Sequence, residues 1–174
     1  MKTPSYDPKT LTRPLGPDEV EWMIVSTKDD RTTLAPYIEA RVVMQRLDEA
    51  FGPFNWQLRF REFAAAEHRG VLAEIAVRHP ETGEWVVKSD GAEPSDNEPF
   101  KGALSNALKR AAVQWGIGRE LYDYPTITIE GKHKYIPYPV LDRLRKIVEA
   151  IASGKKPPRY IRLTRHGDFA QKAA

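Results

Sequence analysis

Three positively charged side chains lie at helical spacing in one stretch of the chain. Lys101 and Lys109 are separated by two helical turns, with Ser105 midway between them, and Arg110 follows directly. In an α-helix the two lysines would be about 12 Å apart on one face, at a rise of 1.5 Å per residue. Lys and Arg neutralise nucleic-acid phosphates without reading sequence. The spacing favours contact with a polyanion, while periodicity alone leaves open an ordinary solvated helix face.

Other side chains can extend such a contact. Arg41 lies in an earlier helical segment and Arg59 and Arg61 in a strand-like one, and these arginines can add to the same groove. Five tyrosines lie near basic residues and are candidates for stacking on bases. They are Tyr122, Tyr124, Tyr135, Tyr138 and Tyr160.

Metal and nucleophile chemistry finds little support in the composition. The chain has no Cys, and its 4 His residues are scattered along the sequence. These facts argue against a zinc site and against cysteine catalysis. The sequence also has no Gly-x-Ser-x-Gly motif, the usual frame of a nucleophilic serine in α/β-hydrolases. The residues therefore give no support for zinc, cysteine or serine-hydrolase chemistry.

An acidic segment over residues 90–98, DGAEPSDNE, suggests one alternative. A metal-dependent nuclease would use Asp90, Glu93 and Asp96, but two-metal chemistry needs carboxylates on a rigid frame, and a polar loop next to prolines does not supply one. A third hypothesis is an assembly module whose basic faces are only solvated and that does not bind DNA.

Length and charge limit the class of protein. The chain has 174 residues, with 27 Lys+Arg and 24 Asp+Glu, and no apolar run long enough for a transmembrane helix. We expect one domain and a cytoplasmic protein without a membrane partner. Residues 141–174 carry 9 basic and 3 acidic side chains. Residues 153–174 are expected to form a basic tail, with Lys155, Lys156 and Arg159 as accessory DNA contacts.

Helices are predicted from apolar spacing, caps and breakers. Four prolines within residues 1–17 indicate an extended N-terminal arm. Residues 18–25 are predicted to form a short helix and residues 26–33 a loop. A helix is predicted over residues 35–51, ended by Gly52 and Pro53. A helix is predicted over residues 99–115 and a last one over 140–152.

Strand periodicity appears between the two central helices. Apolar and polar residues alternate from Trp56 to Arg61, over residues 71–78 and over residues 84–89, and turns separate these segments. They predict a three-stranded antiparallel β-meander, which the helix over 99–115 must cover. One more strand is expected over residues 126–129. On the helix over residues 99–115, the predicted buried face is formed by Phe100, Leu104, Ala107, Leu108, Ala111 and Trp115.

Two segments together resemble a known family. One runs from Tyr37 to Val43 (YIEARVV) and on through DEAFG to Trp56, and the other contains KGALSNALKRAA, followed by WGIGR and Leu121-Tyr122. In this order they resemble the first core helix and the signature basic helix of the Rad fifty-two-type single-strand annealing and recombination mediator family. The resemblance covers roughly residues 18–125.

The resemblance implies an α+β fold with a helix, β-meander, helix core (β-β-β-α) that assembles into a closed homo-oligomeric ring. The DNA-contacting Lys-Arg pair of the family falls on Lys109 and Arg110, with Lys101 on the same helix. The groove arginine of the first core helix falls on Val42, one residue from Arg41. A further basic position of the signature helix is Val113 here, which would weaken annealing relative to binding.

The same resemblance implies a function. Members of the family bind single-stranded DNA in double-strand-break repair and recombination, protect 3′ ends or anneal complementary strands, and need neither ATP nor a metal. Its bacterial damage-response members imply a cytoplasmic, nucleoid-associated protein. The single-strand DNA-binding and oligomerisation domain is expected over residues 18–152. Joining the meander edges of neighbouring subunits into one sheet would remove unpaired edge strands.

Overall fold

The computed structural model of the chain describes residues 7–65, 68–94 and 99–170. Over these residues the chain separates into two compact units. The first unit comprises Met1–Arg13 and Ile38–Arg119 and the second Pro14–Tyr37 and Glu120–Ala174, each as far as its residues are described. Most of the first unit is an insertion between two parts of the second. The single-strand DNA-binding and oligomerisation domain expected over residues 18–152 includes parts of both units and stays a prediction.

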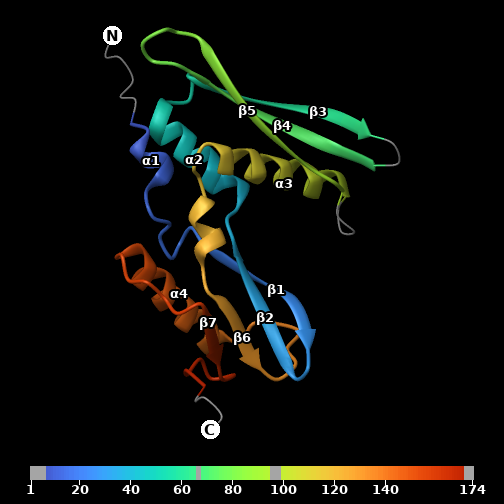
Figure 1. The fold of residues 1–174 in the computed structure, drawn as a ribbon, viewed down its shortest axis with the longest axis vertical. Coiled ribbons are helices and arrows are strands. Elements are labelled where there is room, and N and C mark those ends of the chain that lie inside the picture. Colours follow the sequence, from blue (N-terminus) through green and yellow to red (C-terminus); the bar gives the residue numbers. More distant parts are fainter. Residues whose placement is uncertain (1–6, 66–67, 95–98, 171–174) are drawn as a thin grey trace. The chain divides into compact units, whose positions relative to one another are not determined.

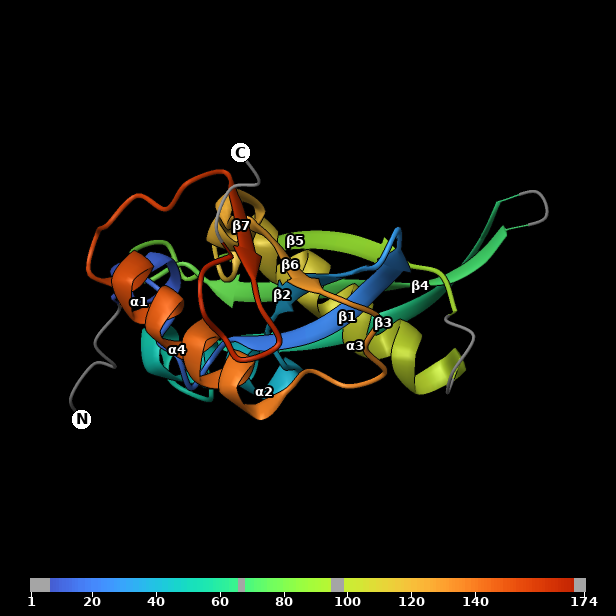
Figure 2. The same ribbon diagram turned by 90° about the horizontal axis from the view of Figure 1, so that it is seen from below.

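The first unit contains the antiparallel sheet that the alternation predicted. Its strands, in spatial order, are β3 (Trp56–Ala65), β4 (His68–Arg78) and β5 (Trp85–Ala92). Alternate β4 side chains are buried on one face of this sheet: Val71, Ala73, Ile75 and Val77. The helix α3 (Pro99–Gln114) lies along β4 and β5 (Figures 1 and 2). The meander and its covering helix are therefore confirmed.

A second helix of this unit, α2 (Ala40–Phe51), ends where the sequence predicted. The backbone of Gly52 has a φ of 76°, and its N–H donates to the carbonyl of Asp48 at 2.8 Å. Glycine reaches this left-handed conformation without a steric penalty, which is why it stops the helix. The start of the predicted helix at residue 35 is wrong, because residues 35–37 belong to a strand.

The second unit is built on a four-stranded sheet that we did not predict. Its strands, in spatial order, are β1 (Glu21–Lys28), β2 (Arg31–Tyr37), β6 (Thr126–Glu130) and β7 (Tyr160–Leu163). The first three are antiparallel, and β7 runs parallel to β6. The helix α4 (Tyr138–Ala152) closes an apolar core against this sheet. Its buried side chains are Leu34, Ile127, Ile129, Val140, Leu144, Ile147, Ile161 and Leu163.

The helix expected over residues 18–25 and the loop over 26–33 are both wrong. These residues contain β1 and the start of β2, joined by a two-residue turn at Asp29 and Asp30 with φ of 51° and 54°. Left-handed turns of this length match the twist of a β-hairpin. Four consecutive apolar side chains over residues 22–25 have no period that separates a helix from a strand, so pairing with β2 decides the outcome.

The N-terminal segment is not the extended arm that its prolines indicated, as far as it is described. Residues 7–17 include a short helix, α1 (Lys9–Thr12), and bury Leu11 and Leu15. The N–H of Asp7 donates to the carbonyl of Ala50 at 3.1 Å, which places the start of this segment, in the first unit, against α2. Residues 1–6 of the expected arm lie outside the described residues.

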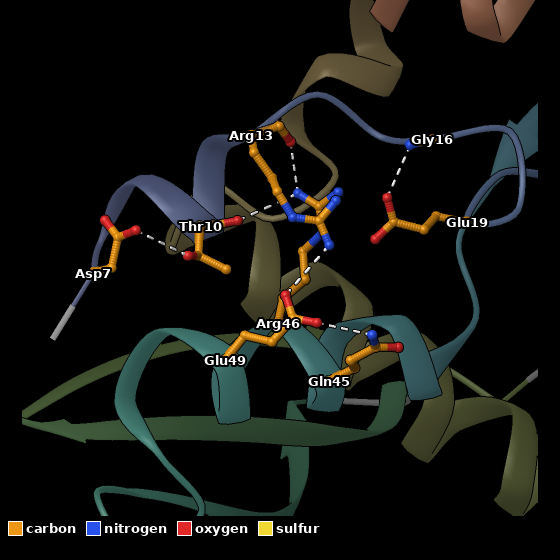
Figure 3. Close-up of polar contacts among 8 residues, drawn as sticks. All are labelled: Asp7, Thr10, Arg13, Gly16, Glu19, Gln45, Arg46 and Glu49. Carbon is orange, nitrogen blue, oxygen red and sulfur yellow. Dashed lines mark hydrogen bonds and ion pairs between the residues drawn. The ribbon is translucent and has the colours of Figure 1, made fainter. Parts of the chain in front are cut away.

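A buried arginine fixes residues 10–13 to α2 (Figure 3). The side chain of Arg46 is 1% exposed, and its Nη1 donates to the carbonyls of Arg13 at 2.6 Å and Thr10 at 3.5 Å. The guanidinium of Arg13 in turn pairs with Glu49 at 3.3 Å. A charged side chain is rarely buried without partners, so Arg46 stabilises the position of residues 10–13.

The C-terminal part of the second unit matches the sequence in part. The strand predicted over residues 126–129 and the helix over 140–152 are confirmed as β6 and α4. The segment 153–174, which we expected to be a basic tail, contains β7, with Ile161 and Leu163 buried between exposed cations. Residues 171–174 of that segment are not described.

In the part of the chain that is described, helices are too short or too polar to span a lipid bilayer.

Candidate nucleic-acid interface

The predicted cations lie on α3, which is anchored by small side chains. Ala103, Ala107, Leu108, Ala111 and Ala112 are its buried residues. Alanine has the highest helix propensity and allows close packing on the sheet. The predicted buried face is wrong at Phe100, which is 69% exposed and borders an open depression lined also by Phe63, Gly70 and Val71.

At its other end α3 is fixed by an aromatic side chain. The ring nitrogen of Trp115 donates to the carbonyl of Ile75 at 3.3 Å, and the ring meets Phe51 edge-on at 6.2 Å between centroids. Lys88 lies over the same ring, and its amino group donates to the carbonyl of Gln114 at 3.0 Å. These contacts set the rotation of α3, and therefore the direction of its polar side chains.

Arg110 points toward the sheet. Its Nε and Nη2 both donate to one carboxylate oxygen of Asp90 on β5, at 3.1 and 3.0 Å. The ion pair orients the guanidinium but uses only two of the five N–H donors of an arginine. Both partners remain partly exposed to solvent, so the pair contributes at most about 1 kcal/mol to stability.

Lys109 and Arg110 lie on different flanks of α3, because consecutive helical residues are about 100° apart around the axis. Burial lowers the pKa of Lys109, and the nearby carboxylate of Glu39 acts in the opposite direction. Glu39 immediately precedes α2 and pairs with the guanidinium of Arg41 at 3.0 Å. The structure thus gathers Lys109 and Arg41 around one carboxylate, and Lys101 is exposed in the first turn of α3.

The two strand arginines lie elsewhere. Arg59 is opposite Glu74 and Arg61 is opposite Leu72, and this register directs both side chains to the face of the sheet that α3 does not cover. Arg61 pairs with Glu74 at 3.1 Å. A single copy of the chain therefore does not bring Arg59 and Arg61 into one groove with the cations of α3. Their contact with DNA stays a prediction.

The accessory cations belong to the second unit. Lys155 and Lys156 are exposed just after α4, and the guanidinium of Arg159 lies over the ring of Tyr160, 5.5 Å from its centroid. Of the predicted stacking tyrosines, Tyr124 packs beside Trp22, at 6.4 Å between ring centroids. The other four are exposed.

The acidic segment does not form a nuclease site among the described residues. Asp90 lies in β5 and is engaged by Arg110, and Glu93 pairs with His68 at 3.1 Å. Asp96 lies outside the described residues. Over the ranges that the structure covers, His, Asp and Glu side chains form no group of three able to hold a metal ion. The two described carboxylates of this segment thus already have basic partners.

Sequence reasoning missed two charged residues of the first unit. Arg46 was not singled out, because a charged residue in an amphipathic helix normally faces solvent. Arg46 lies four residues before Ala50 and therefore on the same, apolar face of α2, and this spacing could have indicated that its side chain is buried. Glu39 was missed because a carboxylate is not expected among phosphate-binding cations.

The architecture and the cation-bearing helix agree with a family of repair proteins. A model of the Rad52/22 family of double-strand break repair proteins matches residues 8–139. This match covers more than half of the chain, and the chain belongs to that family. The resemblance of the two sequence motifs is thereby confirmed.

Individual relatives carry more specific names. The single-stranded DNA-binding protein DdrA of Deinococcus radiodurans is 35% identical over 122 residues, which are 67% of this chain and 55% of DdrA. DdrA of Deinococcus deserti is 37% identical over 122 residues, covering 67% of this chain and 57% of the relative. The mitochondrial genome maintenance protein MGM101 of Kluyveromyces lactis is 29% identical, covering 93% of this chain and 57% of MGM101. The chain spans little more than half the length of these relatives.

Proposed function

We propose that this chain is a non-enzymatic protein that binds single-stranded DNA independently of sequence in double-strand-break repair. The observation that carries the proposal is the cation-bearing helix α3 in a member of the Rad52/22 family, two of whose relatives are named single-stranded DNA-binding proteins. Lys101, Lys109 and Arg110 would contact the phosphates, together with Arg41 at the start of α2.

The electrostatics around Glu39 support this proposal. Lys109 and Arg41 are two cations that lie near the carboxylate of Glu39. Burial lowers the pKa of Lys109, and a phosphate beside it would favour the charged form again. Arg110 keeps donors beyond those that it gives to Asp90. These cations and hydrogen-bond donors suit an anionic ligand such as a phosphate.

We propose further that the protein acts as a homo-oligomeric ring in the bacterial cytoplasm, associated with the nucleoid. In the three-stranded sheet, β3 and β5 are edge strands, which a neighbouring subunit could pair with. Phosphate contacts leave the bases open to a second strand, as annealing requires, and a continuous ring would protect a 3′ end. This activity requires no ATP, metal or other cofactor.

The test is binding of a fluorescein-labelled oligothymidylate, followed by anisotropy between 50 and 200 mM salt. Each phosphate contact on a single strand contributes about 0.7 to the slope of log affinity against log salt. Lys109→Gln with Arg110→Gln should reduce this slope by about 1.4, so that the loss of affinity is about sevenfold larger at 50 than at 200 mM salt.

A matched control removes two cations of the same unit that lie outside the proposed site. Lys9 on α1 and Arg78 on β4 are both exposed, and Lys9→Gln with Arg78→Gln should leave the slope nearly unchanged. Electron microscopy of the same samples should show equal assembly with and without the substitutions. We call the variant with Lys109→Gln and Arg110→Gln the α3 variant. Equal salt slopes for wild type and the α3 variant would disprove the assignment of the site. Absence of salt-dependent binding by the wild-type protein would disprove the function.

A further inference from the structure

The loop between β6 and α4 exposes two aromatic rings beside two cations. We call residues 131–138 the Tyr135 loop. Tyr135 is 84% exposed and Tyr138 is 79% exposed. Lys132 and Lys134 are exposed as well, and residues 131–141 contain no Asp or Glu. Glu130 directly precedes the loop and Asp30 contacts its first residue, but the charged side chains of residues 131–141 themselves are basic and lie beside flat apolar rings.

The backbone of the Tyr135 loop is held firmly by the hairpin β1–β2. The hydroxyl of the buried Thr32 donates to the carbonyl of Gly131 at 2.9 Å and accepts the N–H of His133 at 3.0 Å. The N–H of Gly131 donates to the carbonyl of Asp30 at 2.8 Å. The Nε2 of His133 lies 2.7 Å from the carbonyl of Glu130.

The loop is also fixed at its far end. Ile136 packs against the core of the second unit, and Pro137, with its restricted φ, leads directly into α4. The tyrosines therefore extend outward from an ordered backbone, and little loop entropy is lost when a ligand contacts them. Tyrosine itself has few rotatable bonds and adds a large rigid contact area.

We propose that the Tyr135 loop is a second contact for single-stranded DNA, in which Tyr135 and Tyr138 stack on bases and Lys132 and Lys134 bind the neighbouring phosphates. Aromatic rings interleaved with cations are the usual means of binding single strands without sequence preference. Stacking uses the face of a base and leaves its Watson–Crick edge open, so this contact is compatible with annealing. The inference rests on the proposed function.

Exposure of a tyrosine is not enough for this assignment. Tyr122 is 75% exposed, but it lies on the 3-10 helix η1 (Arg119–Asp123) between Glu120 and Asp123. A phosphate next to those carboxylates would be repelled. Tyr122 therefore offers the same ring at a similar exposure in an acidic setting, which makes it a matched control.

The experiment compares anisotropy titrations of a labelled oligothymidylate and of an abasic strand of the same length. A base stacked on an aromatic side chain contributes about 5- to 150-fold in affinity. Tyr135→Ala with Tyr138→Ala should weaken oligothymidylate binding by at least about fivefold, whereas the double Phe variant and Tyr122→Ala should bind like wild type. On the abasic strand the Ala variant should match wild type.

The lysines give an independent measurement. Lys132→Gln with Lys134→Gln should reduce the salt slope by about 1.4, on both strands alike. All the substituted side chains are exposed, so thermal unfolding followed by circular dichroism should be unchanged.

Three outcomes would overturn the inference. If the double Ala variant binds oligothymidylate like wild type while the α3 variant does not, the Tyr135 loop is not a DNA contact and the proposed function stands. A loop that instead docks a protein would give this same result. Equal losses on the two strands would rule out base stacking. A wild-type protein that binds neither strand would refute both proposals together.

Discussion

Arg46 provides the sharpest test of how the first unit is held together. Replacing it by Met keeps an unbranched apolar side chain but removes every donor. A hydrogen bond from a charged group contributes about 1.5–3 kcal/mol, and a buried carbonyl left without a donor costs about 1–3 kcal/mol. Arg46 serves the carbonyls of Arg13 and Thr10, so Arg46→Met should lower the free energy of unfolding by about 2–5 kcal/mol.

The same helix supplies the control. Arg41 is exposed and pairs only with Glu39 among the contacts that the structure gives for it, so Arg41→Met should cost no more than about 1 kcal/mol. Urea unfolding measures both values. Hydrogen exchange at the amide of Leu11, which bonds to the carbonyl of Pro8, should accelerate in Arg46→Met alone. Equal unfolding free energies for the two variants would refute the role given to Arg46.

Two further predictions concern alkaline pH and backbone conformation. Burial lowers the pKa of Lys109, so just below the ordinary lysine pKa the unfolded chain binds more protons than the folded chain. In that pH range the free energy of unfolding should rise with pH, while the affinity for single-stranded DNA should fall. Lys109→Arg stays protonated and should abolish both trends, which urea unfolding and anisotropy titrations at several pH values would measure. Gly167 has a φ of 80°, and an added Cβ would collide with the carbonyl oxygen of Pro139, whereas Gly154, at 87°, has open space. Gly154→Ala should cost about 1–2 kcal/mol in urea unfolding and Gly167→Ala more than about 3 kcal/mol, and equal costs would show that the collision is relieved.

The first unit was largely predictable from the sequence because its elements have clean periods. One face of β4 is buried, so Val71 to Val77 alternate, and α2 is stopped by a glycine that needs a left-handed backbone. The rotation of α3 was less predictable. Its buried face is mostly alanine, which carries little weight in an apolar pattern, so Phe100 appeared to be a core residue and is exposed.

The second unit was hidden for other reasons. The apolar run from Trp22 to Val25 fits a helix or a strand equally, and the turn at Asp29 and Asp30 lacks the glycine that usually marks a two-residue hairpin. The strand β7 is four residues long and alternates with cations, so local composition resembles a tail. Its parallel pairing with β6 is a long-range contact that sequence pattern does not encode.

The position of the cations could be predicted, but not their partners. Spacing placed Lys101, Lys109 and Arg110 on one helix, which the structure confirms. It did not predict that Asp90 would hold Arg110 or that Glu39 would lie near Lys109, because both carboxylates come from distant segments. The local net charge of a site depends on such neighbours, and they are set by tertiary structure.

The insertion of one unit within the other has a consequence for synthesis of the chain. The hairpin β1–β2 is complete at Tyr37, but β7, the last strand of its sheet, ends at Leu163. At translation rates of about 5–20 residues per second, roughly 6–25 seconds separate them. During that time the inserted segment can fold, while Trp22 and Leu34 remain exposed because β6, α4 and β7, which complete their core, have not been synthesised. An isolated hairpin is marginally stable at best, so the nascent chain leaves these apolar residues open to chaperones and to aggregation during that interval.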